Sequence, residues 1–171
     1  MKKFMIAAIA FFAVLGIAIG SMLISASRVR RYERETDDHR RDVLTNYTKV
    51  YAVHSDDEKP DVSLSPGNTV SFLTAVTRTG LLHKYFLPKS DGETVTVTFA
   101  DGAEYTVIDG GLNKNGKDVV YIIYKFDGHT YYFELSEYQT FDRVLKVTSP
   151  EGFGYDNWLL EEDAQSADDA A

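Results

Sequence analysis

The sequence predicts an α+β protein in which an N-terminal transmembrane helix and a charged helical stalk precede a small antiparallel β-meander domain of about five strands. Three observations predict this class: an uncharged run over residues 4–24, dense charge over residues 28–42, and alternating β-branched and aromatic runs beyond residue 90. A length of 171 residues leaves room for one ordinary domain beside the N-terminal segments. We therefore divide the chain into a transmembrane anchor or uncleaved signal (1–27), a charged juxtamembrane stalk (28–47), a β-rich globular domain (48–160) and a disordered acidic tail (161–171).

Composition excludes several classes of protein. Hydrophobic residues make up 44% of the chain and aromatic residues 13%, which is too much for a disordered chain. The absence of cysteine excludes a disulfide framework and thiolate metal sites. A formal net charge of −8 argues against a nucleic-acid partner, because such binding neutralises phosphates with Lys and Arg.

The uncharged run is long enough for a membrane span, so the lipid bilayer is the first expected partner. A helix rises about 1.5 Å per residue, and about 20 apolar residues cross the hydrocarbon core. A cleaved signal peptide is the alternative, since Lys2 and Lys3 precede the run and small residues at 18–20 and 25–27 suit a peptidase. The run exceeds the usual apolar region of a signal, about 7–15 residues, which favours a retained anchor.

Basic residues on both sides of the run give conflicting evidence on orientation. We expect these residues to flank the membrane: Lys2, Lys3, Arg28, Arg30, Arg31 and Arg34. The positive-inside rule alone places the large domain in the cytoplasm. A short leader with two lysines is instead common in exported chains. We expect a single-pass protein of the cell membrane with an extracytoplasmic domain, and a cytoplasmic domain is the alternative.

Residues 28–42 alternate arginine with acidic residues and leave little apolar surface to bury. This pattern predicts a solvent-exposed helix that prolongs the membrane span, with His39 as a solvated polar residue. A second interpretation gives the arginines a contact with anionic lipid headgroups, worth about 1 kcal/mol each.

The next segments carry weaker signals. A first strand is predicted over residues 48–53, followed by a long loop rich in turn-forming residues. Residues 69–87 are interpreted as a helix that covers the sheet, with His83 and Lys84 near its C-terminal end, where cations are favoured.

The β-rich part begins with strict alternation over residues 94–99. A short turn at Asp101-Gly102 joins this run to a strand at residues 104–108. The glycine- and asparagine-rich residues 109–118 are interpreted as a strand connection rather than a calcium loop.

A second hairpin is predicted over residues 119–135. Its turn is Asp127-Gly128, a pair preferred where both central residues need positive φ. Residues 119–124 are apolar on both faces, which predicts a central strand. A last strand is predicted over residues 143–148.

Aromatic residues supply the candidate partner-binding surface. Tyrosines on strands usually serve packing, but Tyr124 and Tyr132 are interpreted as outward-facing contacts for a partner. A small apolar cluster before the acidic tail is the second candidate, either as a linear motif or folded over the sheet edge: Trp158, Leu159 and Leu160.

No motif assigns catalytic chemistry. The four histidines are spread singly, without a zinc-binding spacing, and no nucleophile elbow or phosphate loop is present in the sequence. We therefore assign no catalytic residue, no metal ligand and no cofactor, and we predict a non-enzymatic protein. An envelope hydrolase is the catalytic alternative, and a cleft with close carboxylates or a buried His–Asp pair would favour it.

The order of an apolar helix, a polar helical extension and an antiparallel meander resembles the general layout of type IV pilins and pseudopilins. The resemblance concerns architecture only. Pilin-like proteins carry a peptidase site of glycine followed by an aromatic residue or Met, and a Glu early in the apolar run, whereas this chain begins Met-Lys-Lys-Phe-Met. The resemblance implies a filament or secretion-apparatus subunit. Our first expectation is an exported binding or assembly domain with a protein partner at the envelope, and a cytoplasmic membrane-tethered regulator is a further alternative.

Overall fold

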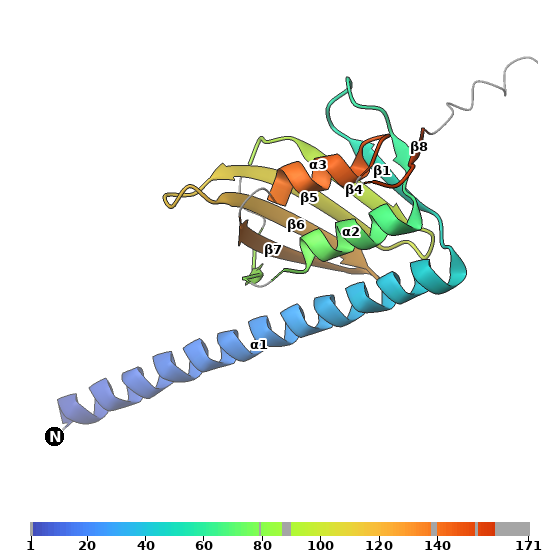
Figure 1. The fold of residues 1–171 in the computed structure, drawn as a ribbon. Helices are drawn as coiled ribbons and strands as arrows, with labels where there is room; N and C mark the ends of the chain where they lie inside the picture. The colour runs from blue at the N-terminus through green and yellow to red at the C-terminus, as the bar shows by residue number, and fades with distance from the viewer. Residues whose placement is uncertain (1, 79, 87–89, 138–139, 153, 160–171) are drawn as a thin grey trace, which may run out of the picture.

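The protein is a long N-terminal helix joined to a mixed domain of one sheet and two shorter helices (Figure 1). The computed structural model describes residues 2–78, 80–86, 90–137, 140–152 and 154–159, without the side chains of residues 2–4 and 7–8. The class is α+β, as the sequence predicts. The acidic tail at 161–171 lies outside the described residues.

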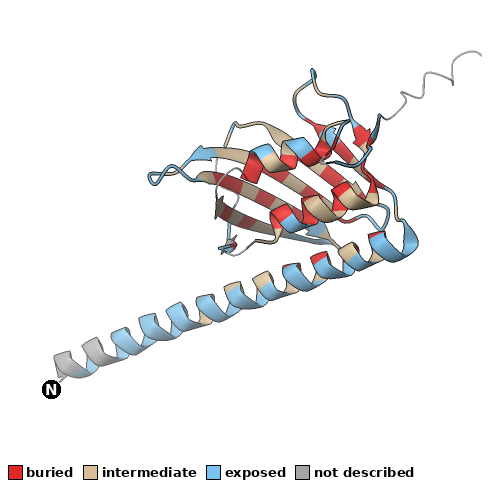
Figure 2. Cartoon of the chain, viewed as in Figure 1, coloured by how far each residue is buried: buried red, intermediate tan, exposed pale blue. Residues whose placement is uncertain are grey.

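Helix α1 (Lys2–Asn46) runs without a break through the apolar segment and the charged segment. Its first half protrudes from the domain, and its second half packs along it (Figure 2). The helix ends at Asn46, and the next residue, Tyr47, has a φ of 52°, in the left-handed region that usually selects glycine at this position.

The sheet has eight strands in the order β3-β7-β6-β5-β4-β1-β2-β8, and every described pair is antiparallel. Its centre is a meander of four consecutive strands: β4 (Thr94–Phe99), β5 (Glu104–Leu112), β6 (Asp118–Phe126) and β7 (His129–Glu137). Four short strands extend the two edges: β1 (Val50–His54), β2 (Val62–Ser63), β3 (Leu82–Lys84) and β8 (Trp158–Leu159). The strand predicted over residues 48–53 corresponds to β1, but the predicted number of about five was too low because β2, β3 and β8 have only two or three residues each, too few for an alternating pattern.

The register gives the sheet one buried face and one partly exposed face. Cross-strand partners Val107, Ile122 and Phe133 lie on the buried face, in line with the alternation that the sequence predicts. The opposite face carries Thr96 and Thr106, whose hydroxyls lie 3.1 Å apart. Tyr121 and Ile123 of β6 also lie there and are only partly buried, so the central strand is covered on one face alone.

All three helices cover the buried face. Helix α2 (Pro66–Val76) starts at Ser65, whose hydroxyl accepts the backbone N–H of Asn68 at 3.2 Å, and proline occupies its first turn. Helix α3 (Thr140–Thr148) lies beside α2 in Figure 1. One covering helix was predicted; the charged segment of α1 and α3 are the additional ones.

Buried Asn157 joins the start of α2 to the end of α3. Its Oδ1 accepts from the Ser65 backbone N–H at 2.8 Å and from Asn68 Nδ2 at 2.9 Å. Its Nδ2 donates to the carbonyl oxygens of Val147 at 2.9 Å and Ser149 at 2.8 Å. Helix ends leave such carbonyls unpaired, so this side chain completes the end of α3.

Two sequence predictions are corrected here. Residues 143–148 form part of α3 rather than a strand, because Phe141, Val144 and Val147 then lie on one face and pack on the sheet. Residues 69–87 are not one helix: α2 ends at Val76, and the chain returns as β3. His83 and Lys84 therefore lie on an edge strand and not at a helix C-terminus.

Candidate functional site

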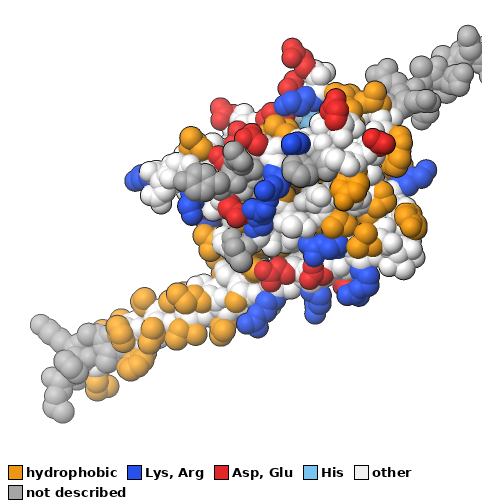
Figure 3. Space-filling view, viewed as in Figure 1, with side chains coloured by type: hydrophobic (Ala, Val, Ile, Leu, Met, Phe, Trp, Pro, Cys, Tyr) orange, Lys and Arg blue, Asp and Glu red, His pale blue; other side chains and the backbone are white. Residues whose placement is uncertain are grey.

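The protruding half of α1 is apolar and exposed on all sides. Its large side chains between Met5 and Ile24 are 41% to 73% exposed, and none of them packs on the domain (Figure 3). By length and composition, it is the one helix of the described chain that can cross a membrane. Such a surface suits a lipid environment, where each apolar side chain gains by leaving water.

The predicted membrane-flanking residues divide into three groups. Lys2 and Lys3 lie in the first turn of α1, and their side chains are outside the described residues. Arg30 and Arg34 are exposed. Arg28 and Arg31 contact the domain.

Arg31 links α1 to the sheet through two contacts. Its Nε donates to Glu35 Oε1 at 2.7 Å, and its guanidinium lies 5.8 Å from the centre of the Tyr131 ring. The Glu35 carboxylate raises the pKa of Arg31 further above its usual value. Arg31 is therefore less free for lipid contact than Arg30 and Arg34.

Arg28 meets the edge strand β3 beside the apolar half of α1. Its Nη1 lies 2.9 Å from His83 Nε2, while the Ser25 hydroxyl lies 3.3 Å from His83 Nδ1. Partial burial and then the Arg28 charge lower the pKa of His83. Because Arg28 only donates, neutral His83 accepts at Nε2. The neighbouring Tyr85 hydroxyl donates to the carbonyl oxygen of Ser21 at 3.1 Å.

Buried polar contacts replace the expected solvated face of the charged segment. His39 is 6% exposed, and its Nδ1 lies 2.8 Å from the Tyr105 hydroxyl. Its Nε2 lies 3.0 Å from Asp101 Oδ2, and Thr36 Oγ1 lies 3.1 Å from the same Tyr105 hydroxyl. The prediction of a fully exposed helix with a solvated His39 was wrong, because one face of this helix packs on the sheet.

An aromatic cluster completes this contact. The Tyr32 ring is fully buried, with its centre 4.5 Å from Phe133, 5.2 Å from Tyr124 and 6.0 Å from Tyr105. The Tyr32 hydroxyl donates to the Val76 carbonyl oxygen at 3.0 Å, at the end of α2. Burying one such ring stabilises the fold by about 1.5–3 kcal/mol. The second half of α1 is thus a core element of the domain.

The contact between His39 and Asp101 brings together the two residue types that the hydrolase alternative calls for, but only His39 is buried, because the Asp101 side chain is 45% exposed. Tyr105 is fully buried, and burial raises the pKa of its hydroxyl well above the usual value. His39, Asp101 and Tyr105 do not line the hollows beside α2. The His39 imidazole and the Tyr105 hydroxyl are enclosed by the fold, whereas the Asp101 carboxylate is open to solvent at the rim of this contact.

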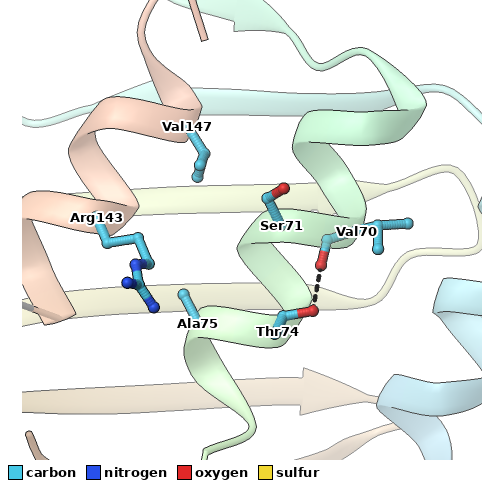
Figure 4. Close-up of a pocket in the computed structure, with 6 residues that line it drawn as sticks. All are labelled: Val70, Ser71, Thr74, Ala75, Arg143 and Val147. Carbon is cyan, nitrogen blue, oxygen red and sulfur yellow. Dashed lines mark hydrogen bonds between the residues drawn. The ribbon is translucent and has the colours of Figure 1, made fainter. Parts of the chain in front are cut away.

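Two hollows flank α2. The first, of about 220 Å³, separates Ser71 and Ala75 of α2 from Arg143 and Val147 of α3 (Figure 4). This volume is below the roughly 300–1,000 Å³ typical of small-molecule sites.

The second hollow is a wide and open one between α1 and α2. Two carboxylates in its lining form ion pairs, Asp37 with Arg40 at 2.6 Å and Glu137 with Arg78 at 3.0 Å. Among the described residues, no group of three or more His, Asp or Glu can hold a metal ion. Glu33 is the third carboxylate of this lining, and it is exposed.

The candidate partner-binding residues are not brought together. Tyr124 is fully buried, so the expectation that it faces outward was wrong; burial, Tyr105 and Glu35 together raise the pKa of its hydroxyl. Tyr132 lies half-buried on the open face of the sheet, paired with Lys84 in the register. Trp158 and Leu159 lie on the opposite edge strand, and both are 57% exposed. Leu160 is outside the described residues.

The sequence interpretation missed the face of α1 that holds the domain. Its buried residues are Tyr32, Thr36, His39 and Val43, at successive spacings typical of one helical face. Only two of the four are apolar, and charged neighbours surround them, so the pattern was hidden. The spacing of the uncharged positions is the signal that could have found it.

Comparisons with family models, with curated proteins and with solved structures find no match to this chain.

Proposed function

We propose that the protein is a single-pass membrane-anchored protein whose β-rich domain binds a protein partner or supports an assembly at the extracytoplasmic surface, without catalysis. The observation that carries the proposal is the continuity of α1. Its exposed apolar half suits a bilayer, and its second half is part of the core of the domain. The domain is therefore attached to the membrane by a rigid helix.

The edge strand β8 supports a partner-binding role. Trp158 and Leu159 are large apolar side chains that remain exposed at the end of the sheet. Aromatic residues of this kind often dominate binding energy at protein interfaces. This edge is our candidate contact for the envelope partner.

Protease accessibility of intact cells or spheroplasts tests the orientation. We expect external protease to digest the domain before lysis, and the intact mass to retain residues 1–27. A cytoplasmic protein of the same cells serves as the lysis control. Protection until lysis would contradict the extracytoplasmic placement and favour the cytoplasmic regulator, and loss of the leader would contradict the anchor.

Site-specific photocrosslinking tests the partner contact. A crosslinking amino acid at Trp158 should give a discrete adduct in membranes, and Leu159→Asp should abolish it. Leu112, which is 71% exposed on β5, provides the matched control position. Equal labelling from Leu112 and Trp158 would contradict a contact at β8.

A filament subunit is the second candidate, because a protruding apolar half-helix and a sheet-packed half-helix are what the pilin-like layout requires. Filament formation by the purified full chain would favour it. A species that stays monomeric at increasing concentration in detergent and in lipid would favour the anchored binding domain.

A further inference from the structure

The edge of the sheet nearest the apolar half of α1 carries an exposed apolar patch. We call Leu82, Tyr85 and Phe86 the β3 platform. Leu82 is 55% exposed, Tyr85 is 47% exposed and Phe86 is 84% exposed. A Phe side chain this exposed contributes little to the core of the domain, and its apolar surface faces the surroundings.

The platform is fixed at a defined height along α1. The Tyr85 hydroxyl donates to the carbonyl oxygen of Ser21, and the Tyr85 ring centre lies 5.8 Å from the Arg28 guanidinium. His83, two residues earlier, contacts Ser25 and Arg28. Figure 1 shows β3 beside α1 at the edge of the sheet.

This height coincides with the end of the apolar run. The run is uncharged from residue 4 to residue 24, and Ser21 lies about one helical turn before its end. A span of about 20 residues fills the hydrocarbon core, so Ser21 lies at the hydrocarbon edge on the side of the domain. The headgroup region adds only several ångströms beyond that edge. Tyr85 is thus held within the polar boundary of the bilayer.

We infer that the β3 platform inserts into the headgroup region of the same bilayer that α1 crosses, which gives the protein a second membrane contact. The inference rests on the proposed membrane anchoring. Tyr and other amphipathic aromatic rings favour this boundary, and Phe86 gains by leaving water. Arg30 is exposed on α1 roughly 13.5 Å beyond Ser21, so its long side chain can reach back toward lipid phosphates, whereas Arg34 lies one turn farther from the boundary.

The chemistry of β3 suits this partner. Lys84 Nζ lies 2.7 Å from Glu134 Oε2, so the positive charge of this strand is paired within the sheet. Residues 82–86 contain no acidic side chain that anionic lipid would repel. The segment therefore presents apolar and aromatic surface to the membrane and keeps its charge on the sheet.

Depth-dependent fluorescence quenching in the full chain tests the inference. Trp158 is the only tryptophan, so Trp158→Phe gives a silent background. Three substitutions are made separately in this background. Phe86→Trp is the probe, Leu15→Trp in the apolar half is the embedded reference, and Tyr47→Trp just beyond the far end of α1 is the aqueous reference. The protein is reconstituted in phosphatidylcholine–phosphatidylglycerol vesicles containing lipids brominated near the headgroup or deep in the chain.

We expect Phe86→Trp to emit at a shorter wavelength than Tyr47→Trp and to be quenched most by shallow bromines, whereas Leu15→Trp is quenched most by deep bromines. If Leu15→Trp is quenched and Phe86→Trp behaves like Tyr47→Trp, the platform inference is overturned and the anchor stands. If Leu15→Trp is not quenched, the anchoring proposal fails and the platform inference fails with it. Tyr85→Trp gives an independent reading should Phe86→Trp fold poorly.

Discussion

The Nδ1 atom of His39 and the hydroxyl of Tyr105 lie 2.8 Å apart in a contact that is closed to solvent and joins α1 to β5. His39 Nε2 lies 3.0 Å from Asp101 Oδ2, and Thr36 Oγ1 lies 3.1 Å from the Tyr105 hydroxyl. The Tyr105 hydroxyl therefore contacts two polar side chains of α1.

Removing the Tyr105 hydroxyl should destabilise the protein. Tyr105→Phe leaves His39 Nδ1 and the Thr36 hydroxyl buried without this partner, at a cost of about 1–3 kcal/mol. Tyr124→Phe is the matched control, because the Tyr124 hydroxyl is buried and has no hydrogen-bond partner among the described residues. Denaturant unfolding of the full chain in detergent measures both variants. Equal losses in the two variants would contradict the polar contact.

Asn157 should tolerate no change of charge. In Asn157→Asp, an acceptor oxygen replaces the amide that donates to the carbonyls of Val147 and Ser149, so we expect a loss of roughly 2 kcal/mol or more. Asp156→Asn, the reverse exchange at an exposed neighbour, should change little. Thermal unfolding followed by far-UV circular dichroism compares them. A loss no larger than that of Asp156→Asn would refute the joining role of Asn157.

Acidification below neutrality should weaken the domain. Burial lowers the pKa of His54 below 6.5, and burial together with Arg28 does the same for His83. The unfolded chain therefore takes up these protons first as pH falls, so stability is complete above about pH 6.5 and declines below it, toward the lower folded pKa values. The measurement is the unfolding midpoint between about pH 8 and about pH 5, a range in which most carboxylates stay ionised.

Histidine variants test this pH prediction, and the exposed His129 provides the control. His83→Gln and His54→Gln should each flatten the decline, while replacement of the exposed His129 by Gln should leave it unchanged. A decline that survives in the double variant His54→Gln, His83→Gln would assign the pH dependence to other groups.

The end of α1 is a site for stabilisation. Tyr47 has a φ of 52° and is 75% exposed, so Tyr47→Gly relieves the left-handed backbone and loses little packing. We expect a gain of about 0.5–1 kcal/mol in the free energy of unfolding. Leu44→Gly, an exposed position inside the same helix, should lose about as much. A loss for both variants would show that the Tyr47 side chain matters more than its backbone.

The sequence predicted those elements that local chemistry decides. Asp127 and Gly128 form the expected turn, with φ of 49° and 71°, because two residues alone determine that geometry. The alternating strand β4 has the predicted bounds for the same reason. The transmembrane candidate was predicted because an uncharged run can be recognised without knowledge of the fold.

Elements whose conformation depends on distant partners were missed. The β-branched residues Val144, Val147 and Thr148 favour a strand locally, yet together with Phe141 they form the buried face of α3. His39 and Asp101 are 62 residues apart, so their contact cannot be seen in any local window. The outward placement of Tyr124 failed because the face of β6 that it occupies is decided by where α1 packs.

The unbroken path of α1 from Ile24 to Tyr32 also determines where the domain can go. A flexible linker of n residues would let it explore a radius of about 5–6 Å × √n above the lipid. If α1 crosses the bilayer as proposed, a continuous helix removes that freedom: the domain keeps one distance from the bilayer and one face toward it, and it can rotate only with the helix. A soluble partner would then have to reach the membrane surface to bind, whereas a partner embedded in the same membrane would meet every copy in the same orientation.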